Sequence, residues 1–414
     1  MIYRCKYLVT LSGNPIPNGC LRIEKDRIVE VGTLEELKIQ KDEKFLDYPD
    51  AIILPGLINA HCHLELGMVR GQLPRGESFP IWANRLRKVL ENIGAEVYRE
   101  AAKLGIMECL KNGITTIVDV GNSGAALNEL ANLPIRSFGY LEVLGLNPKI
   151  SVEKFSQAQA MIADRSYKSK SESSLSPSLF SAGITCHAPF SCSVELQKLI
   201  AKNSVLENGP YCLHVAESAE EISMFRDGHG PLMDFCRRIF PDLILENQHS
   251  PIRFLNHHGL IPEGSLFAHC NFMDEEDMRI LSEKSVSIVH CPRSKEFFNH
   301  GGFDPFTIKK HGINICLGTD SLASNEGFNL FEEMTIFHSH YPNFSFREIL
   351  EMATVNGAKA LGLEGQIGVL QPGAKADFIG IGLRHHPDYD LYEEIITEAH
   401  EVLFVTVDGD AVMV

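Results

Sequence analysis

Residues 51–66 read "AIILPGLINAHCHLEL", an apolar run that ends in two histidines one residue apart. In an extended strand the side chains at positions i and i+2 point to the same side, so we expect His61 and His63 to lie together where this run ends. Two imidazoles on one side of a strand are able to bind one metal ion. A pair of surface histidines is the alternative, and the rest of the sequence has to decide between them.

The same kind of apolar run recurs along the chain, and amphipathic helical stretches separate the runs. After residues 51–60, the runs are 113–120, 135–143, 182–189, 210–217, 265–270, 285–291 and 313–320. Strands that alternate with helices are typical of βα units and a parallel sheet. Eight units predict an α/β fold, a (β/α)8 barrel of the TIM type. We expect helices at 82–112, broken near Gly94, and at 276–284, and a solvated loop in the Ser-rich segment 164–179.

Both ends of the chain read as short alternating strands between turn residues, "CLRIEKDRIVEVG" (20–32) and "EVLFVTVDGDAVMV" (401–414) among them. Asp408-Gly409 is a hairpin signal between apolar segments. We therefore expect residues 1–53 and 366–414 to form one small β-sandwich domain. Residues 54–365 then form the catalytic barrel.

Composition narrows the classes of partner. The chain of 414 residues is 44% hydrophobic and carries a net charge of −16 without a basic run, which argues against nucleic acid and anionic membranes. No apolar stretch approaches the roughly 20 residues of a spanning helix, and "MIYRCKYLVT" lacks the apolar region of a signal peptide. Eleven cysteines without a C-x-x-C predict free buried thiols. We expect a cytoplasmic protein with a small-molecule substrate, and a homodimer as the assembly to test.

Polar residues follow six of the predicted strands at the carboxyl end, where barrels of this type collect their active sites. They are His61 and His63 (first), His187 (fourth), His214 and Glu217 (fifth), His269 (sixth), His290 (seventh) and Asp320 (eighth). A mononuclear site needs three or four nitrogen or oxygen ligands and one open position. The imidazoles of His61, His63 and His214 and the carboxylate of Asp320 supply such a set for Zn²⁺ or Fe²⁺. The ion would lower the pKa of a bound water, Asp320 would accept its proton, and His269 would steer the hydroxide.

The motifs "PGLINAHCHLEL", "HVAES", "HCPRS" and "LGTDS", followed by "ATVNGAKALGLEGQIGVLQPGAKADF", resemble the amidohydrolase superfamily in its aminohydrolase (deaminase) branch over essentially the whole chain. The resemblance implies that His61, His63, His214 and Asp320 are metal ligands. It also implies roles for four other residues: Glu217 as the proton shuttle, His269 as the contact of the hydroxide, His187 as a substrate contact, and His290 as the start of a motif usually written H-C-P-x-S-N. In this sequence Lys295 stands where that motif has Asn.

Two features favour one metal ion and deamination. Many relatives bridge two metals with a modified lysine at the end of strand four, but "AGITCHAPFS" (182–191) has no lysine. A deaminase must protonate a ring nitrogen as hydroxide attacks the amino-bearing carbon, and Glu217 suits that task. We expect attack on an aminated heterocycle, such as C6 of a 6-aminopurine, with loss of ammonia. The H-x-E…P-C-x-x-C signature of the unrelated base deaminases is absent.

Glu65 in "NAHCHLEL" and the following "FPIWANRLRKV" (79–89) resemble deaminases of 6-aminodeoxyfutalosine, from the alternative menaquinone pathway. Deaminases of 5'-methylthioadenosine and S-adenosylhomocysteine, or of guanine, are the alternatives. The futalosine compound carries a benzoate, which requires a cation in the pocket. The substrate-binding candidates are Glu65, His187, His290, Arg293 and Lys295, with Arg70, Arg75 and Arg85 as further cations. An inactive amidohydrolase fold that serves as a binding module is the alternative of another class, and the complete ligand set argues against it.

Overall fold

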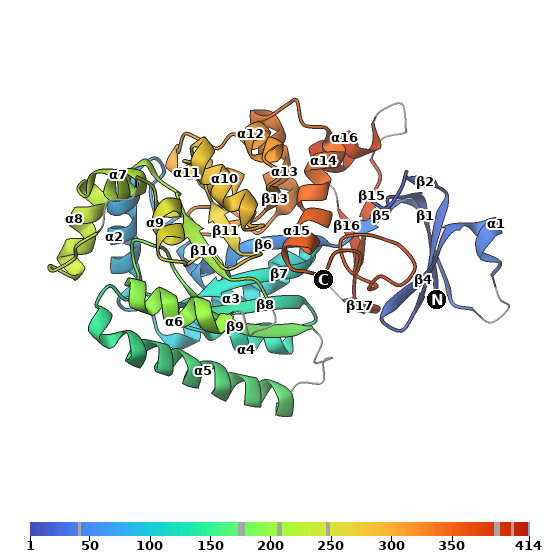
Figure 1. The fold of residues 1–414 in the computed structure, drawn as a ribbon. Coiled ribbons are helices and arrows are strands. Elements are labelled where there is room, and N and C mark those ends of the chain that lie inside the picture. Colours follow the sequence, from blue (N-terminus) through green and yellow to red (C-terminus); the bar gives the residue numbers. More distant parts are fainter. Residues whose placement is uncertain are drawn as a thin grey trace.

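The computed structural model describes residues 1–39, 43–172, 179–204, 209–245, 249–384, 390–398 and 401–412. Strands from the two ends of the chain lie together on one side of the molecule, and a larger body of strands and helices lies beside them (Figure 1). Among the described residues, no helix is both long enough and apolar enough to cross a membrane. All eleven cysteines are buried and unpaired, as the composition predicts.

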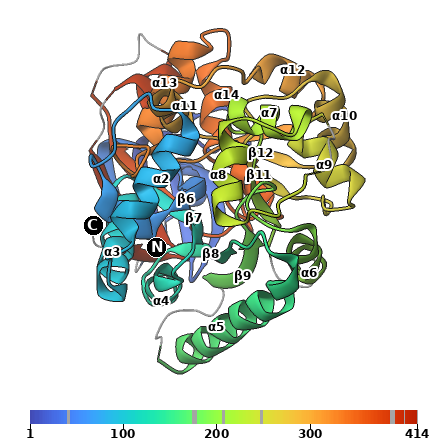
Figure 2. The ribbon, with the colours of Figure 1, turned by 90° about the vertical axis from the view of Figure 1, so that its left-hand side faces the viewer.

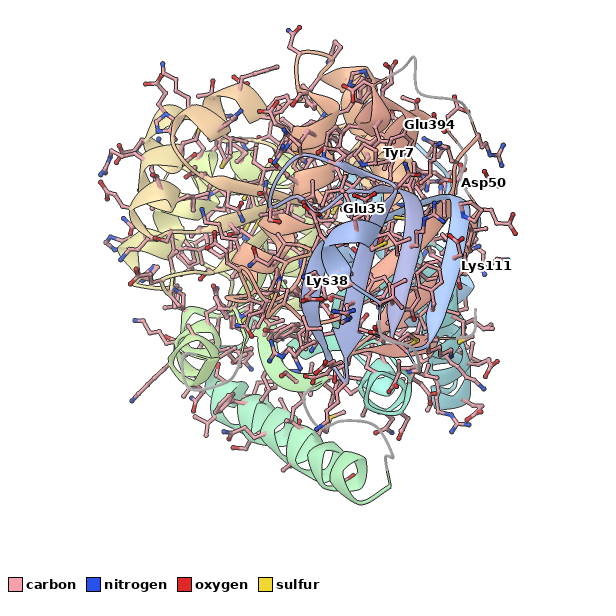
Figure 3. The ribbon with its side chains drawn as sticks, turned by 90° about the vertical axis from the view of Figure 1, so that its right-hand side faces the viewer. Tyr7, Glu35, Lys38, Asp50, Lys111 and Glu394 are labelled. Carbon is pink, nitrogen blue, oxygen red and sulfur yellow. The ribbon has the colours of Figure 1, made fainter. Side chains whose placement is uncertain are left out.

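The terminal strands form one sheet, with the order β17-β16-β15-β5-β1-β3-β4 and with β2 paired to β1. It faces the viewer in Figure 3. Its strands are β1 (Ile2–Leu8), β2 (Ile16–Pro17), β3 (Gly19–Glu24), β4 (Arg27–Thr33), β5 (Phe45–Pro55), β15 (Phe378–Gly382), β16 (Val402–Val407) and β17 (Asp410–Val412). The two ends of the chain meet where β15 pairs antiparallel with β5, with Ile379 opposite Leu54. The two layers of a sandwich and the domain boundaries at 53/54 and 365/366 stay predictions.

Each of the eight predicted barrel runs contains a strand, and these strands form two parallel sheets. One sheet has the order β14-β6-β7-β8-β9 and the other β10-β11-β12-β13. The strands are β6 (Leu57–His63), β7 (Ile114–Gly121), β8 (Arg136–Val143), β9 (Phe180–Cys186), β10 (Cys212–Val215), β11 (Leu266–His269), β12 (Ser287–His290), β13 (Asn314–Leu317) and β14 (Asp320–Ser321). Figure 2 shows these strands in the centre with helices around them.

Two backbone hydrogen bonds join the edges of these sheets. His214 N donates to His187 O over 3.0 Å, and Thr319 N donates to His61 O over 3.1 Å. The α/β class and the parallel strands are therefore present, whereas complete closure into one eight-stranded barrel stays a prediction.

The run at 51–60, expected as one strand, is divided at Gly56. β5 ends at Pro55 in the terminal sheet, and β6 begins at Leu57 in the parallel sheet. A side chain at position 56 would meet Thr115, whose Oγ1 lies 2.1 Å from an ideal Cβ, so only glycine fits this crossing. β6 is therefore the strand that carries both histidines.

The predicted helices are present, but part of one predicted loop is also helical. Gly94 separates α2 (Phe79–Leu90) from α3 (Ala95–Lys111), and α10 covers Glu275–Glu283. The loop expected at 164–179 is wrong up to residue 172, because α5 runs over Ser151–Glu172. No Gly or Pro interrupts this stretch, and extending a helix is far easier than starting one. Residues 173–178 lie outside the described part.

The remaining helices connect and cover the strands. They are α1 (Leu34–Leu37), α4 (Ala125–Asn132), α6 (Val194–Ser204), α7 (Ala219–Asp227), α8 (Pro231–Ile239), α9 (Pro251–His257), α11 (Pro292–Phe298), α12 (Pro305–Lys310), α13 (Leu330–His340), α14 (Phe346–Met352), α15 (Val355–Ala360) and α16 (Leu391–Thr397), with the 3-10 turns η1 (Leu64–Val69) and η2 (Pro148–Ile150). Apolar residues of α4, α6, α9, α12, α13, α14 and α16 pack with many of the strands into one large core, whereas those of α7, α8 and α11 form a second cluster. The histidines and carboxylates of interest lie at the strand ends.

Candidate metal centre and active site

Three histidines from two strands converge in the interior. His61 and His63 come from β6, and His214 comes from β10. The Nε2 atoms of His63 and His214 are 3.1 Å apart, and the centroid of the His61 ring is 4.9 Å from that of His63 and 4.7 Å from that of His214. One nitrogen of each ring lies within 4.8 Å of the others, and all three side chains are buried. The structure thus brings the three predicted imidazole ligands together.

Asp320 lies directly beside this cluster because β14 pairs with β6, with Asp320 opposite Cys62. Its Oδ1 is 3.8 Å from His61 Nε2 and 3.6 Å from His63 Nε2. Its Oδ2 accepts hydrogen bonds from the hydroxyls of Ser294 (2.6 Å) and Ser324 (3.0 Å). Burial opposes ionisation, but the surrounding imidazoles and the Ser294 hydroxyl hold the pKa of Asp320 well below its usual range. The group is therefore a carboxylate at neutral pH.

Glu217 and His269 lie beside the same cluster of ligands. His269 ends β11, and its Nε2 lies 3.8 Å from Glu217 Oε1. His269 also forms a group with His61 and Asp320 whose ligand atoms lie within 4.8 Å of one another. Burial, followed by the negative charge of Asp320, raises the pKa of Glu217 well above its usual range. Burial therefore favours the protonated form of Glu217, which is the form that donates a proton.

His187 lies against the cluster from the end of β9. Its ring centroid is 4.9 Å from that of His214, and its carbonyl oxygen accepts a hydrogen bond from His214 Nδ1 over 2.8 Å. Burial lowers the pKa of His187 to about 3, so the imidazole is neutral. The carbonyl of His187 fixes the His214 tautomer with Nδ1 protonated, which leaves Nε2 free for a metal.

The other predicted substrate contacts have different surroundings. His290 is fully buried and stacks on Phe303 with a centroid distance of 3.6 Å. Both oxygens of Glu65 accept hydrogen bonds from residues 122 and 123, the backbone N–H groups at 2.7 and 2.9 Å among them. Arg293 forms ion pairs with Glu326 (3.7 Å) and Glu332 beside a groove of about 550 Å³. Contact of these three residues with a substrate stays a prediction.

The cations considered for a substrate carboxylate fall into two groups. Arg70, Arg75 and Arg85 each have an acidic partner, at Glu108, Glu326 (3.1 Å) and Glu77 (2.8 Å) respectively. Lys295 is half-buried in α11, and burial lowers its pKa. Among the described residues, no carboxylate forms an ion pair with Lys295. Lys295 is therefore the cation of this set for which no acidic ion-pair partner is found among the described residues.

The donor set fits a divalent ion. Two nitrogens bound to Zn²⁺ at 2.0–2.1 Å with tetrahedral geometry lie about 3.3 Å apart, close to the 3.1 Å between His63 and His214. His61 Nε2 is buried without a hydrogen-bond partner among the described residues, which is costly unless another group satisfies it. Burial keeps the pKa of His61 and His214 well below 6.5, so both imidazoles are neutral, as metal ligation requires.

Comparison with known proteins shows the same family over most of the chain. The model of the amidohydrolase family matches residues 52–412. The chain belongs to the amidohydrolase family. This membership confirms the predicted family and the enzyme class, a hydrolase of carbon–nitrogen bonds.

Individual relatives of this amidohydrolase are deaminases. A 5-methylthioadenosine/S-adenosylhomocysteine deaminase of Pyrococcus furiosus is 28% identical over 380 residues, which cover 87% of this chain and 83% of the relative. The solved aminofutalosine deaminase of Helicobacter pylori, in complex with methylthio-coformycin, has a TM-score of 0.84 at 22% identity and full coverage of both chains. An adenosine deaminase of Xanthomonas campestris with bound zinc has a TM-score of 0.81 at 20% identity and covers 99% and 92%. The two structures support the fold.

The sequence reasoning missed Glu142, the second-last residue of β8, which lies beside the histidine cluster. Its Oε1 is 3.5 Å from His214 Nδ1, and it has no hydrogen-bond partner among the described residues. Burial raises the pKa of Glu142 well above its usual range. The signal was available, because Glu142 lies at the carboxyl end of the third predicted strand, where the other site residues also lie.

An aromatic cluster beside the histidines was also missed. Phe79 packs against Trp82, Phe190 and Phe298 with ring centroids 5.8–5.9 Å apart. Phe190 in turn meets the His187 ring edge-on at 5.6 Å. The segment "FPIW" (79–82) carries half of this cluster, but spacing alone cannot distinguish such aromatics from ordinary core residues.

Proposed function

We propose that this amidohydrolase is a metal-dependent hydrolytic deaminase, which replaces the amino group of an adenosine-type compound by oxygen and releases ammonia. One observation carries the proposal: Glu217, whose protonated form burial favours, lies with His269 beside the cluster of His61, His63, His214 and Asp320. A buried acid beside a metal-ligand set is what protonation of a ring nitrogen requires. The relatives that are deaminases of adenosine-type compounds support the same reaction.

In the proposed mechanism His61, His63, His214 and Asp320 hold one divalent ion, Zn²⁺ in preference to Fe²⁺. When bound, such an ion lowers the pKa of a water from 15.7 towards about 7. Asp320, ionised at neutral pH, accepts the proton of the attacking water. Glu217 donates its proton to the ring nitrogen next to the amino-bearing carbon, so that negative charge does not accumulate on the ring.

His269 and His187 orient the reactants. Burial lowers the pKa of His269, so the neutral imidazole is able to donate one hydrogen bond to the attacking oxygen. His187 is neutral as well and lies against His214 at the end of β9. From this position it contacts the purine in the proposed mechanism. Asp320 then passes its proton to the amino group, which leaves as ammonia, and the hydroxyl proton of the intermediate returns to Glu217, so that water supplies the new carbonyl oxygen.

Within this class we propose 6-aminodeoxyfutalosine as the preferred substrate. The half-buried Lys295 favours a substrate with an anionic end, because a charge-assisted hydrogen bond would compensate its loss of hydration. The buried aromatic cluster around Phe79 and Trp82 reaches His187 through Phe190, so it makes the surroundings of His187 apolar, which favours an aromatic ring of the substrate. The second candidates are 5'-methylthioadenosine and S-adenosylhomocysteine, the substrates in the name of a relative that matches 87% of this chain.

The test is ammonia release by the zinc-loaded protein from 6-aminodeoxyfutalosine, 5'-methylthioadenosine, S-adenosylhomocysteine, adenosine and guanine. We expect the highest kcat/KM for the first compound and none of this activity in His61→Ala. A preference for S-adenosylhomocysteine or guanine would contradict the substrate but not the reaction. Stoichiometric binding of these compounds without ammonia release would instead favour the inactive binding module.

A further inference from the structure

The backbone around Glu217 is strained and lies between two elements. β10 ends at Val215 and α7 begins at Ala219, so Glu217 belongs to neither. Ala216, directly before it, has a φ of +52°, in the left-handed region that residues other than glycine rarely adopt. Such a conformation persists only where the surroundings enforce it, and it is found disproportionately at functional sites.

Two buried polar side chains form hydrogen bonds with the backbone N–H and C=O of Glu217. Glu217 N donates to Glu221 Oε2 over 2.9 Å, and Glu217 O accepts from Asn271 Nδ2 over 3.0 Å. The exposed fractions of Glu221 and Asn271 are 1% and 3%, so water does not compete for these contacts. The two residues come from separate elements, α7 and the segment after β11.

Each of these two side chains also has one polar atom that forms no hydrogen bond with any described residue. Glu221 Oε1 and Asn271 Oδ1 are buried without a hydrogen-bond partner among the described residues. An apolar residue would avoid that cost, which is typically 1–3 kcal/mol for each such group. A structural role in packing alone therefore does not explain why a carboxyl and an amide occupy these two positions.

We propose that Glu221 and Asn271 are positioning residues that fix the carboxyl of Glu217 for proton transfer. They act on the two peptide groups that flank its Cα, so they set the direction of the side chain towards His269 and the reacting ring. This inference rests on the proposed function, since it assumes that Glu217 is the proton donor. Misplacement of a catalytic group by about 1 Å can cost as much as 10²-fold in rate.

The experiment compares Glu221→Ala and Asn271→Ala with Glu221→Gln, which keeps an oxygen to accept from Glu217 N. Glu394→Ala is the matched control, because Glu394 is also buried and its Oε1 also accepts a hydrogen bond from a backbone N–H, that of Arg384 at 2.9 Å. Glu394 lies on α16, which carries none of the proposed site residues (Figure 3). We expect both alanine variants to lose roughly 10- to 100-fold in kcat with little change in KM or metal content. Glu221→Gln should recover most of this loss, and Glu394→Ala should leave kcat within about threefold.

Hydrogen exchange of the amides at 216–219 provides a readout that does not need turnover. Both alanine variants should exchange faster there than the wild type and the control, because they lose contacts of this backbone. Unchanged kcat or unchanged exchange in both alanine variants would overturn the inference, as would a Glu221→Gln enzyme as slow as Glu221→Ala. Should Glu221→Ala not fold, Asn271→Ala gives the same comparison.

Failure of this inference differs from failure of the proposed function. An active wild type, an inactive Glu217→Gln and fully active positioning variants would refute the positioning role alone. A wild type that releases no ammonia from any of the compounds would refute the function, and the exchange data would then still test the contacts.

Discussion

His63 Nε2 and His214 Nε2 lie 3.1 Å apart, although the two residues are 151 positions apart and come from strands of different sheets. This separation is close to that of two nitrogens bound to one tetrahedral ion, and the unpartnered His61 Nε2 and the Asp320 carboxylate lie beside the pair. We therefore predict one divalent metal per chain. His61→Ala should lose both metal and activity, while His229→Ala, on an exposed histidine, should keep both. Elemental analysis of the purified proteins measures the stoichiometry, and two fully occupied metals bridged by a modified lysine would contradict the prediction.

Glu217→Gln should keep the metal and lose turnover. The substitution removes the proton donor but no metal ligand. General acid–base groups typically contribute 10²–10⁴-fold to the rate. Steady-state kinetics with metal analysis of the same sample test this expectation. Turnover within about threefold of the wild type would show that Glu217 is not the proton shuttle.

Stability should depend on pH through Glu221. Burial raises the pKa of Glu221 to about 8, although the hydrogen bond from Glu217 N favours its ionised form. In the unfolded chain an ordinary glutamate has a pKa of about 4.3. Between these values the folded state holds a proton that the unfolded state releases, so this contribution to the free energy of unfolding is fully present below about pH 4.3 and is lost as the pH rises towards 8.

Glu221→Gln removes this titration. The melting temperature of the wild type should therefore fall relative to that of Glu221→Gln as the pH rises from about 5 to about 8. Metal-free samples of both proteins, melted in the same buffers, make the comparison. A constant difference over this range would mean that Glu221 does not carry a raised pKa.

Lys295 should affect the choice of substrate more than the chemistry. Losing a charge-assisted hydrogen bond to a buried anion costs about 1.5–3 kcal/mol, or roughly 10- to 100-fold in kcat/KM. We expect Lys295→Met to lose this much on 6-aminodeoxyfutalosine and little on adenosine. Arg85→Met, which removes an exposed cation already paired with Glu77, is the control. Equal losses on both substrates would place Lys295 outside the binding of the anionic end.

The sequence predicted the fold well wherever a local pattern decides the structure. All eight barrel runs contain a strand, and the break at Gly94 is present, because apolar periodicity and glycine act over a few residues. The division at Gly56 was not visible, since it depends on contact with Thr115 from another strand. The helix that continues to residue 172 was missed because a Ser-rich composition resembles a loop when the growth of a preceding helix is ignored.

The candidate site was partly predictable for a similar reason. Residues at the ends of parallel strands meet in space, so His61, His63, His214 and Asp320 could be grouped before any coordinates. Spacing says nothing of contacts between side chains and distant backbone. The hydrogen bond from Asn271 to Glu217 and those from residues 122 and 123 to Glu65 therefore became visible only in the structure.

The most direct test of the central claim is deamination in ¹⁸O-labelled water. Zinc-loaded protein should release one ammonia per product from 6-aminodeoxyfutalosine or another adenosine-type compound, and the product should carry one ¹⁸O on the carbon that lost the amino group. His61→Ala and metal-free protein should form neither. Absence of ammonia from every compound, or a product without ¹⁸O, would contradict a hydrolytic deaminase.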